Sequence, residues 1–429
     1  MVYSRRQYLD RLIEKKDNGL IKIVTGLRRV GKSFLLFSLF KKHLIESGIG
    51  EDQIIEMSLD DIENVRYRNP FELNAFVKRC LVDGSKRYYV LLDEIQFVSE
   101  VANPYAPNDT VTFIDVLLGL MKIPNVDIYV TGSNSRMLSS DVLTQFRGRG
   151  DEVRVNPLSF SEVKEHYSGD ERNLLQEYYT YGGLPWVWML GSHEERSAYL
   201  GNQLTGTYLK DILERNRISN GSQVLESLLD VLASSIGSLT NPCRLSNTFD
   251  SERHIKVSSD TIDKYIGYFM DSFLIERVQR YDVKGRKYIR TPMKYYFTDT
   301  GLRNAKLGFR QVEETHLLEN IVFNDLVRRG FDVDVGVVER NAVNGFGKNV
   351  REQLEVDFVV NKGSERCYIQ SALTIADPEK RKQEIASLLR IPDSFRKIVV
   401  VKDYMESLFD ENGIQYVGIE QFLSDERFI

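Results

Sequence analysis

One stretch near the amino end constrains this chain more than any other. Residues 26–33 read Gly-Leu-Arg-Arg-Val-Gly-Lys-Ser, which matches the pattern G-x-x-x-x-G-K-[ST] without a gap. The β-branched run 21–25 precedes it, and a helical pattern follows it to about Glu46. A strand, a loop and a helix are the context that this pattern requires. We therefore expect an α/β fold with a parallel sheet, in which this loop binds phosphate.

The residue types of this loop suit a polyphosphate. Gly26 and Gly31 allow the backbone to curl so that amides face phosphate oxygens, and the following helix adds the positive end of its dipole. Lys32 is expected to reach the β- and γ-phosphates, and the Ser33 hydroxyl to bind magnesium. The sequence thus predicts ATP and Mg²⁺ as cofactors. The expected nucleotide-binding residues are nine consecutive ones: Gly26, Leu27, Arg28, Arg29, Val30, Gly31, Lys32, Ser33 and Phe34.

A buried strand that ends in two acids supplies the second half of an ATP site. The apolar run 88–92 leads directly into Asp93 and Glu94. We expect Asp93 to hold magnesium through water, and Glu94 to orient and polarise the attacking water. A solvated strand end is the ordinary alternative for such a pair. A predicted strand (53–59) and helix (71–82) separate the pair from the loop, and this spacing favours the catalytic interpretation.

Polar and basic residues after a third strand are further candidates. The strand 126–131 leads to Ser133 and Asn134, either of which could contact the γ-phosphate from the tip of a strand between the other two; a helix N-cap is the alternative. Arg147 and Arg149 lie in a Gly-rich turn and could reach the nucleotide of a neighbouring subunit, or could be solvated turn residues. We include Arg149 among the expected catalytic residues, which implies a homo-oligomer.

With these motifs in place, the sequence resembles prokaryotic AAA-type ATPases that carry a characteristic C-terminal domain of unknown function. The resemblance spans nearly the whole chain and implies a P-loop ATPase domain with a helical lid over residues 1–200, in an enzyme of poorly defined biological role. The motifs that carry it are residues 26–33, 91–96, 131–135, 148–149, 157–160, 181–185 and 291–302. In the last of these, a turn cap is the expected role of Asp299.

Residues 201–305 are expected to form a winged-helix-like domain, because helical patterns are followed by two strands, 274–281 and 288–296. The hairpin 277–294 carries seven Lys or Arg and one acid, so it is a credible DNA-contacting wing. The helix before it carries Asp260, Asp263 and Asp271, a poor charge set for reading bases. The alternative is a winged-helix fold used only for packing or protein contact.

Residues 306–429 resemble the core of PD-(D/E)XK nucleases, which bind magnesium between an acid on one strand and an acid or glutamine on the next. The resemblance matches Asp357 to the first acid, Gln370 to the second ligand and Glu319 to an acid on a helix. Ala372 stands where the family has a lysine, and Glu355 is a possible helper. Because this arrangement lacks a cation and one acid, we expect no nuclease activity, and a fold retained for binding or assembly.

Composition bounds the remaining choices. No run of about 18 apolar residues exists, the first ten residues lack a signal core, and the three cysteines are scattered, which predicts a cytoplasmic protein without a membrane span. The net charge of −5 neither supports nor excludes DNA. We expect an ATP-hydrolysing, DNA-associated switch or motor with a degenerate nuclease-like domain. The alternatives are an ATP-dependent nuclease and an ATP-controlled signalling scaffold that binds no nucleic acid.

Overall fold

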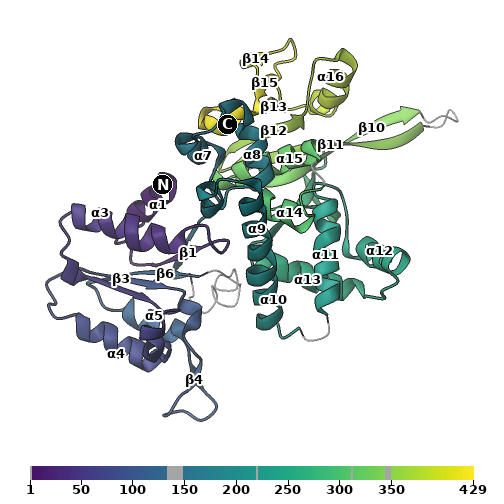
Figure 1. Cartoon of the computed structure of the whole chain (residues 1–429). Coiled ribbons are helices and arrows are strands. Elements are labelled where there is room, and N and C mark those ends of the chain that lie inside the picture. The colour runs from purple at the N-terminus through teal and green to yellow at the C-terminus, as the bar shows by residue number, and fades with distance from the viewer. Residues whose placement is uncertain (1, 133–147, 219–220, 311–312, 344–348) are drawn as a thin grey trace. The chain divides into compact units, whose positions relative to one another are not determined.

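The computed structural model of the chain describes residues 2–132, 148–218, 221–310, 313–343 and 349–429. Its contacts define two compact units, and Figure 1 shows the elements of each. The first unit comprises Met1–Asn156 with Asp271–Phe273, and the second comprises Pro157–Met270 with Leu274–Ile429. Residues 157–200, which the sequence assigns to the lid of the ATPase domain, therefore pack within the second unit.

The first unit is built on a five-stranded sheet in which every pairing is parallel. The strand before the phosphate loop and the strand that ends in the two acids are not neighbours in this sheet. The third predicted strand lies between them. That order, expected for an ATPase with a catalytic glutamate, is confirmed. The strands, in order across the sheet, are β2 (Ile54–Ser58), β3 (Tyr88–Asp93), β6 (Val126–Thr131), β1 (Ile21–Thr25) and β7 (Gly150–Arg154).

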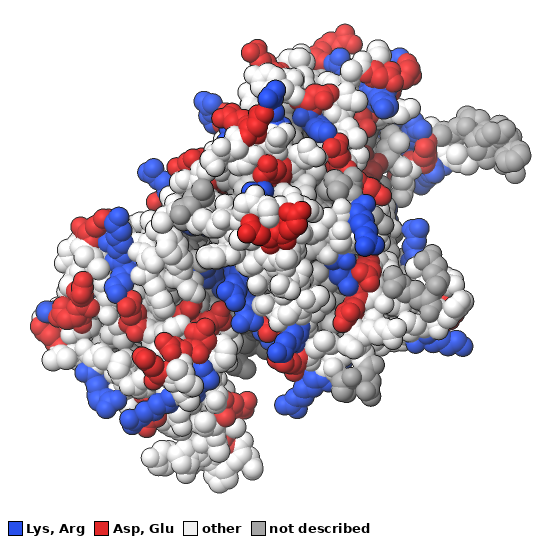
Figure 2. Space-filling view, viewed as in Figure 1, with Lys and Arg blue, Asp and Glu red and all other residues white. Residues whose placement is uncertain are grey.

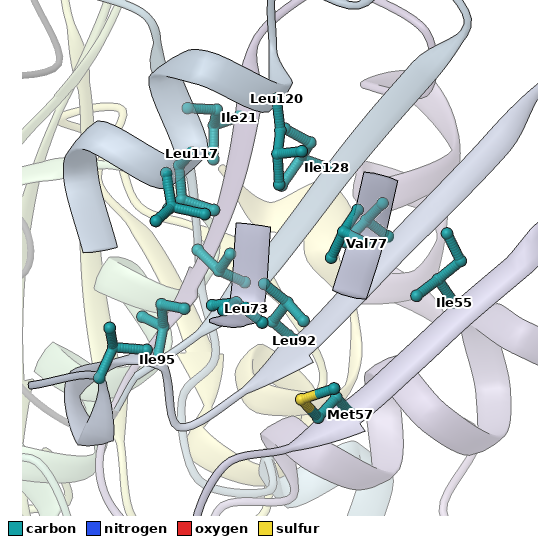
Figure 3. Packing of buried hydrophobic residues seen from close by; sticks show 14 of the residues in the cluster. Ile21, Ile55, Met57, Leu73, Val77, Leu92, Ile95, Leu117, Leu120 and Ile128 are labelled. Carbon is teal, nitrogen blue, oxygen red and sulfur yellow. The ribbon is translucent and has the colours of Figure 1, made fainter. Parts of the chain in front are cut away.

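Helices cover both faces of this sheet, which is why β1, β3 and β6 are buried along their whole length. On one face, α4 (Pro70–Cys80) and α5 (Phe113–Leu120) pack into the apolar cluster drawn in Figure 3. On the other face, the Phe40 ring lies 4.5 Å from the Tyr129 ring, centroid to centroid. Other helices described in this unit are α1 (Arg6–Glu14), α2 (Lys32–Phe34), the π-helical η1 (Leu35–Phe40) and α3 (Lys41–Glu46), with short 3-10 helices at Glu51–Gln53, Ile62–Arg68 and Ile95–Phe97.

The second unit begins with helices. Of these, α7 starts at the predicted capping box, in which Ser159 and Glu162 satisfy each other's backbone N–H groups. Across the described part of the chain, no helix combines the length and apolar character needed to cross a bilayer. The α-helices of the unit are α7 (Phe160–His166), α8 (Glu171–Tyr181), α9 (His193–Gln203), α10 (Lys210–Arg215), α11 (Ser222–Ser234), α12 (Pro242–Arg253), α13 (Ser259–Asp271), α14 (Thr300–Lys306), α15 (Glu314–Arg328), α16 (Pro378–Ile385) and α17 (Ile419–Ser424).

An eight-stranded mixed sheet forms the rest of the second unit. The hairpin β8–β9 is part of it, because β8 pairs in parallel with β10. One sheet therefore runs across residue 305, and separate winged-helix and nuclease-like domains on either side of that residue stay predictions. The strands, in order, are β14 (Leu408–Phe409), β15 (Gln415–Gly418), β13 (Arg396–Val401), β12 (Glu365–Ala372), β11 (Asn349–Lys362), β10 (Asp332–Val343), β8 (Ile275–Asp282) and β9 (Lys287–Phe297).

Asp299 joins two motifs of the second unit that lie far apart in the sequence. Its carboxylate accepts the N–H of Leu302 at 3.0 Å, which caps α14 as predicted, and the N–H of Gly183 at 2.7 Å. A Cβ on Gly182 would lie 2.3 Å from the same carboxylate, so only glycine fits there. Complete burial raises the pKa of Asp299 to about 6, against the opposing effect of these N–H donors.

Candidate nucleotide-binding site and C-terminal acidic cluster

The loop after β1 lies at the carboxyl edge of the parallel sheet, where such folds bind ligands. Gly26 has a φ of 130°, and a Cβ on it would lie 2.1 Å from the carbonyl oxygen of Val155. Gly31 has a φ of 95° and precedes the first turn of α2. Both positions therefore need glycine, the first for space and backbone and the second for backbone alone.

Lys32 is buried at the centre of this loop. Its Nζ donates to the carbonyl oxygens of Gly26 and Leu27 at 3.0 and 3.1 Å. Burial lowers the pKa of Lys32 to about 8, and the nearby carboxylates of Glu94 and Asp93 oppose that shift. A buried ammonium in this setting would be stabilised by an anion, so the loop suits a phosphate. Of the other loop residues, Arg29, Ser33 and Phe34 are exposed, and Arg28 is half-buried.

The ends of β3 and β6 are tied together by Thr131. Its hydroxyl donates to Asp93 Oδ1 and accepts the backbone N–H of Glu94 at 3.0 Å. Asp93 is buried, and Ser58 Oγ lies 3.4 Å from its second oxygen. Thr131 had no predicted role, because only the order of strands places the last residue of β6 beside the acids of β3.

Glu94 has a left-handed backbone with a φ of 52°, which is uncommon outside glycine and concentrates at functional sites. Gln96 Nε2 donates to Glu94 Oε2. Gln96 is thus a second residue that sequence reasoning passed over; its position two residues after the catalytic candidate was the available signal. The arrangement fixes the direction of the Glu94 carboxylate, which a base acting on water requires.

The remaining candidates differ in where they lie. Ser133, Asn134 and Arg147 are outside the described residues. The backbone oxygen of Arg149 accepts the N–H of Ile21 at 2.9 Å, so Arg149 lies where β1 and β7 begin. Since the strands are parallel, that is the edge of the sheet opposite the phosphate loop. Five residues of strand span about 16 Å, which an arginine side chain does not bridge.

Comparison with known proteins assigns a domain type to the part of the chain that contains the phosphate loop. Residues 18–164 match the model of the AAA domain family, and residues 172–313 match that of a domain of unknown function (DUF8612). An uncharacterized protein of Haemophilus influenzae is 32% identical over 425 residues, covering 98% of each chain. An uncharacterized protein of Methanocaldococcus jannaschii is 27% identical, covering 89% of this chain and 81% of its own. The chain therefore belongs to the same family as the Haemophilus protein, and its residues 18–164 form an AAA-type domain.

Among solved structures, the similarity is low. AMPPCP-bound DnaA from Aquifex aeolicus is 14% identical with a TM-score of 0.32, over 62% of this chain and 86% of that one. Aeropyrum pernix ORC1 in complex with DNA is also 14% identical, with a TM-score of 0.27, over 72% of this chain and 93% of that one. The AAA assignment of residues 18–164 rests on the family model instead.

In the second unit, the residues matched to a nuclease centre do come together. Gln370 Nε2 donates to Asp357 Oδ1 at 3.1 Å, and the Ser371 N–H donates to Asp357 Oδ2 at 2.8 Å. Glu319 lies on α15 beside them and is buried. Ala372 packs into the apolar core of the sheet. The sequence anticipated this grouping through the resemblance alone.

The same cluster contains a lysine that the sequence did not assign to it. Lys294 Nζ lies 2.8 Å from Glu319 Oε1 and 2.6 Å from Glu355 Oε1. Although burial works the other way, Lys294 and two further donors, His316 and Tyr296, hold the pKa of Glu319 below its usual value. Burial and the negative charge of Glu319 raise the pKa of Asp357 well above its usual value. The Lys294 ammonium thus forms ion pairs with two carboxylates of this cluster, Glu319 and Glu355.

Proposed function

We propose that this protein binds ATP with magnesium and hydrolyses it. One observation carries the proposal: the ends of β1, β6 and β3 meet at one edge of a parallel sheet. A glycine-bounded loop with a buried lysine follows β1, the buried Asp93 and the half-buried Glu94 follow β3, and Thr131 at the end of β6 contacts both acids. The backbone amides of residues 26–34 and Lys32 would hold the phosphates. Glu94, held by Gln96, would take a proton from the attacking water.

The residues present also fit magnesium. The Ser33 hydroxyl is exposed at the first turn of α2, and the Asp93 carboxylate is anchored by Thr131 at the neighbouring strand end. A hydroxyl next to the phosphate lysine and a strand-end carboxylate are the donors that P-loop enzymes use for this ion. Bound there with the nucleotide, magnesium would neutralise charge on the phosphates.

Two substitutions separate binding from hydrolysis. Lys32→Ala removes the buried cation, so we expect loss of ATP binding or turnover. Glu94→Gln keeps a group that can hydrogen-bond water but cannot take its proton, so ATP should bind and remain intact. The measurements are fluorescent-nucleotide titration and phosphate release on the purified chain. Turnover by Glu94→Gln at the wild-type rate would show that Glu94 is not the base.

We further propose that the hairpin β8–β9 contacts the DNA backbone. Of its seven basic residues, Arg280 and Lys294 are buried and Arg277 pairs with Asp263. The face drawn in Figure 2 has basic and acidic side chains interspersed, so a DNA contact on this face would need a local group of basic residues. The four exposed basic residues at and beside the turn of the hairpin form such a group: Lys284, Arg286, Lys287 and Arg290.

A further inference from the structure

The acidic cluster of the second unit consists of Glu319, Glu355 and Asp357, and the nuclease resemblance implies a magnesium ion among them. A magnesium ion prefers oxygen ligands that are free to face it in octahedral geometry. The described residues contain no group of three or more acidic, histidine or cysteine side chains in an arrangement that could hold a metal.

The partners of each carboxylate explain why a metal does not fit. Glu319 Oε1 already accepts the Lys294 ammonium and the Tyr296 hydroxyl. The two Asp357 oxygens accept the amide of Gln370 and the N–H of Ser371. Gln370 therefore turns its nitrogen toward the acid, and its oxygen lies 3.3 Å from the backbone N–H of Asp357. Both oxygens of Asp357 and one oxygen each of Glu319 and Glu355 are therefore directed at nitrogen or hydroxyl donors.

Access to the cluster is restricted as well. Lys294, Glu319 and Asp357 are 3%, 6% and 7% exposed. The loop between α11 and α12 passes directly over Glu319, because a Cβ on Gly237 would lie 3.2 Å from its Oε2. A phosphodiester could not come within bonding distance of these groups without moving that loop.

We propose that the Lys294 ammonium takes the place of a divalent metal in this cluster. The nuclease-like centre then has a structural role, in which its ion pairs hold parts of the fold together. Lys294 belongs to β9, Glu319 to α15 and Glu355 to β11, and in the sheet β9 pairs only with β8 among the described strands. The ion pairs of Lys294 therefore connect β9, the edge strand of the basic hairpin, to α15 and to β11, a strand with which β9 does not pair.

Replacing the lysine tests the proposal through the thermal unfolding midpoint and its response to a divalent metal. Lys294→Met removes the ammonium that pairs with the buried Glu319 and the part-exposed Glu355 and that lies near the buried Asp357. Loss of the cation from such a cluster is strongly destabilising. We expect the thermal unfolding midpoint of nucleotide-free protein to fall by on the order of 10 °C. Mn²⁺ should raise the midpoint of this variant again, because the freed carboxylates can then bind it. Mn²⁺ should leave the wild-type midpoint unchanged.

Two further variants control the experiment. Lys294→Arg keeps a positive charge and should show no response to Mn²⁺. Lys294→Met combined with Glu319→Gln removes both charges of the pair, so it should be more stable than Lys294→Met alone, and its response to Mn²⁺ should be lost. This double variant keeps the test decisive if the single one does not fold.

The opposite outcome is equally clear. If nucleotide-free wild-type protein binds Mn²⁺ at a site that Asp357→Asn removes, the ammonium does not replace the metal and the proposal fails. DNA cleavage that requires both Asp357 and Lys294 would overturn it more fully, because Lys294 would then be a catalytic lysine supplied from another strand.

Discussion

Asp299 is a buried carboxylate whose titration should be visible in the stability of the protein. Its pKa is about 6 in the folded chain and about 4 in an unfolded one, so the folded state holds the proton more tightly between these values. The stability that this group contributes is therefore present at low pH and is lost as the pH rises from about 4 to about 6, by about 3 kcal/mol. Above that window its contribution is constant.

Asp299→Asn checks this prediction. Asparagine does not titrate, and its NH₂ group would meet one of the N–H donors of Gly183 and Leu302, which costs about 1–3 kcal/mol. Urea unfolding at several pH values should show the advantage of the wild type shrinking between pH 4 and 6. Asp377→Asn, at an exposed N-cap, is the matched control and should show no comparable trend. A gap that stays constant with pH would contradict the assignment.

The hydrogen bonds of Thr131 could not be predicted from the sequence. A threonine at the end of a buried strand is ordinary for its β-propensity. Its bonds to Asp93 and to the Glu94 N–H exist only because β6 is inserted between β1 and β3. Lys294 is a similar case, since its partners Glu319 and Glu355 are 25 and 61 positions away along the chain.

The proposed DNA contact depends on one element, the hairpin β8–β9. Four phosphate contacts from its exposed residues imply a log–log salt slope of about −3.6, which is roughly a hundredfold weaker binding at about 200 mM than at about 50 mM salt. Reversing the charge of Lys284, Arg286 and Lys287 should weaken binding about equally for every sequence, because phosphate contacts carry no base information. Fluorescence anisotropy with duplex and single-stranded DNA measures it.

Charge reversal of Lys380, Lys382 and Arg390 provides the matched control, since these three residues are also exposed in the second unit but far from the hairpin in sequence. That control should bind DNA like the wild type, and both triple variants should retain ATP turnover without DNA. If wild-type protein with ATP binds no DNA at low salt, the hairpin serves another purpose. The ATP-controlled scaffold would then be the better description of the function.

The positions of individual strands were well predicted from the sequence. The strands at Ile21–Thr25 and Val126–Thr131 have the expected bounds, because short β-branched runs between turn residues have few alternatives. The hairpin was also expected, but its sheet was not. Nothing in residues 275–282 indicates that β8 will pair with β10, because pairing between distant strands depends on which edges meet after folding.

At the scale of the whole molecule, the position of Arg149 makes assembly testable. It lies at the edge of the sheet opposite its own phosphate loop, so a catalytic role requires another subunit's nucleotide. Arg149→Ala and Glu94→Gln should each be inactive. Mixed in equal amounts, they should regain up to about a quarter of the wild-type rate, because random assembly pairs an intact site with an intact arginine at one interface in four.

Phosphate release measured before and after mixing is the readout, together with the rate per subunit as the concentration is raised. Lys32→Ala mixed with Glu94→Gln is the control, since neither has a working site and no activity should return. No recovery in the first mixture, from a protein shown to be monomeric, would rule out a trans role for Arg149.

The sequence by itself determined where the candidate nucleotide site lies. Its chemistry is local: a contiguous loop, a strand before it, a helix after it and an acidic pair at a strand end are all written within short segments. The tertiary structure decided what depends on distant segments meeting. Thr131 beside Asp93, Asp299 on the N–H of Gly183, and Lys294 between Glu319 and Glu355 all join residues at least 25 positions apart. A buried polar group needs a hydrogen-bond partner, because burial removes it from water. Which partner it contacts depends on the tertiary fold, since the fold determines which distant segments lie next to each other.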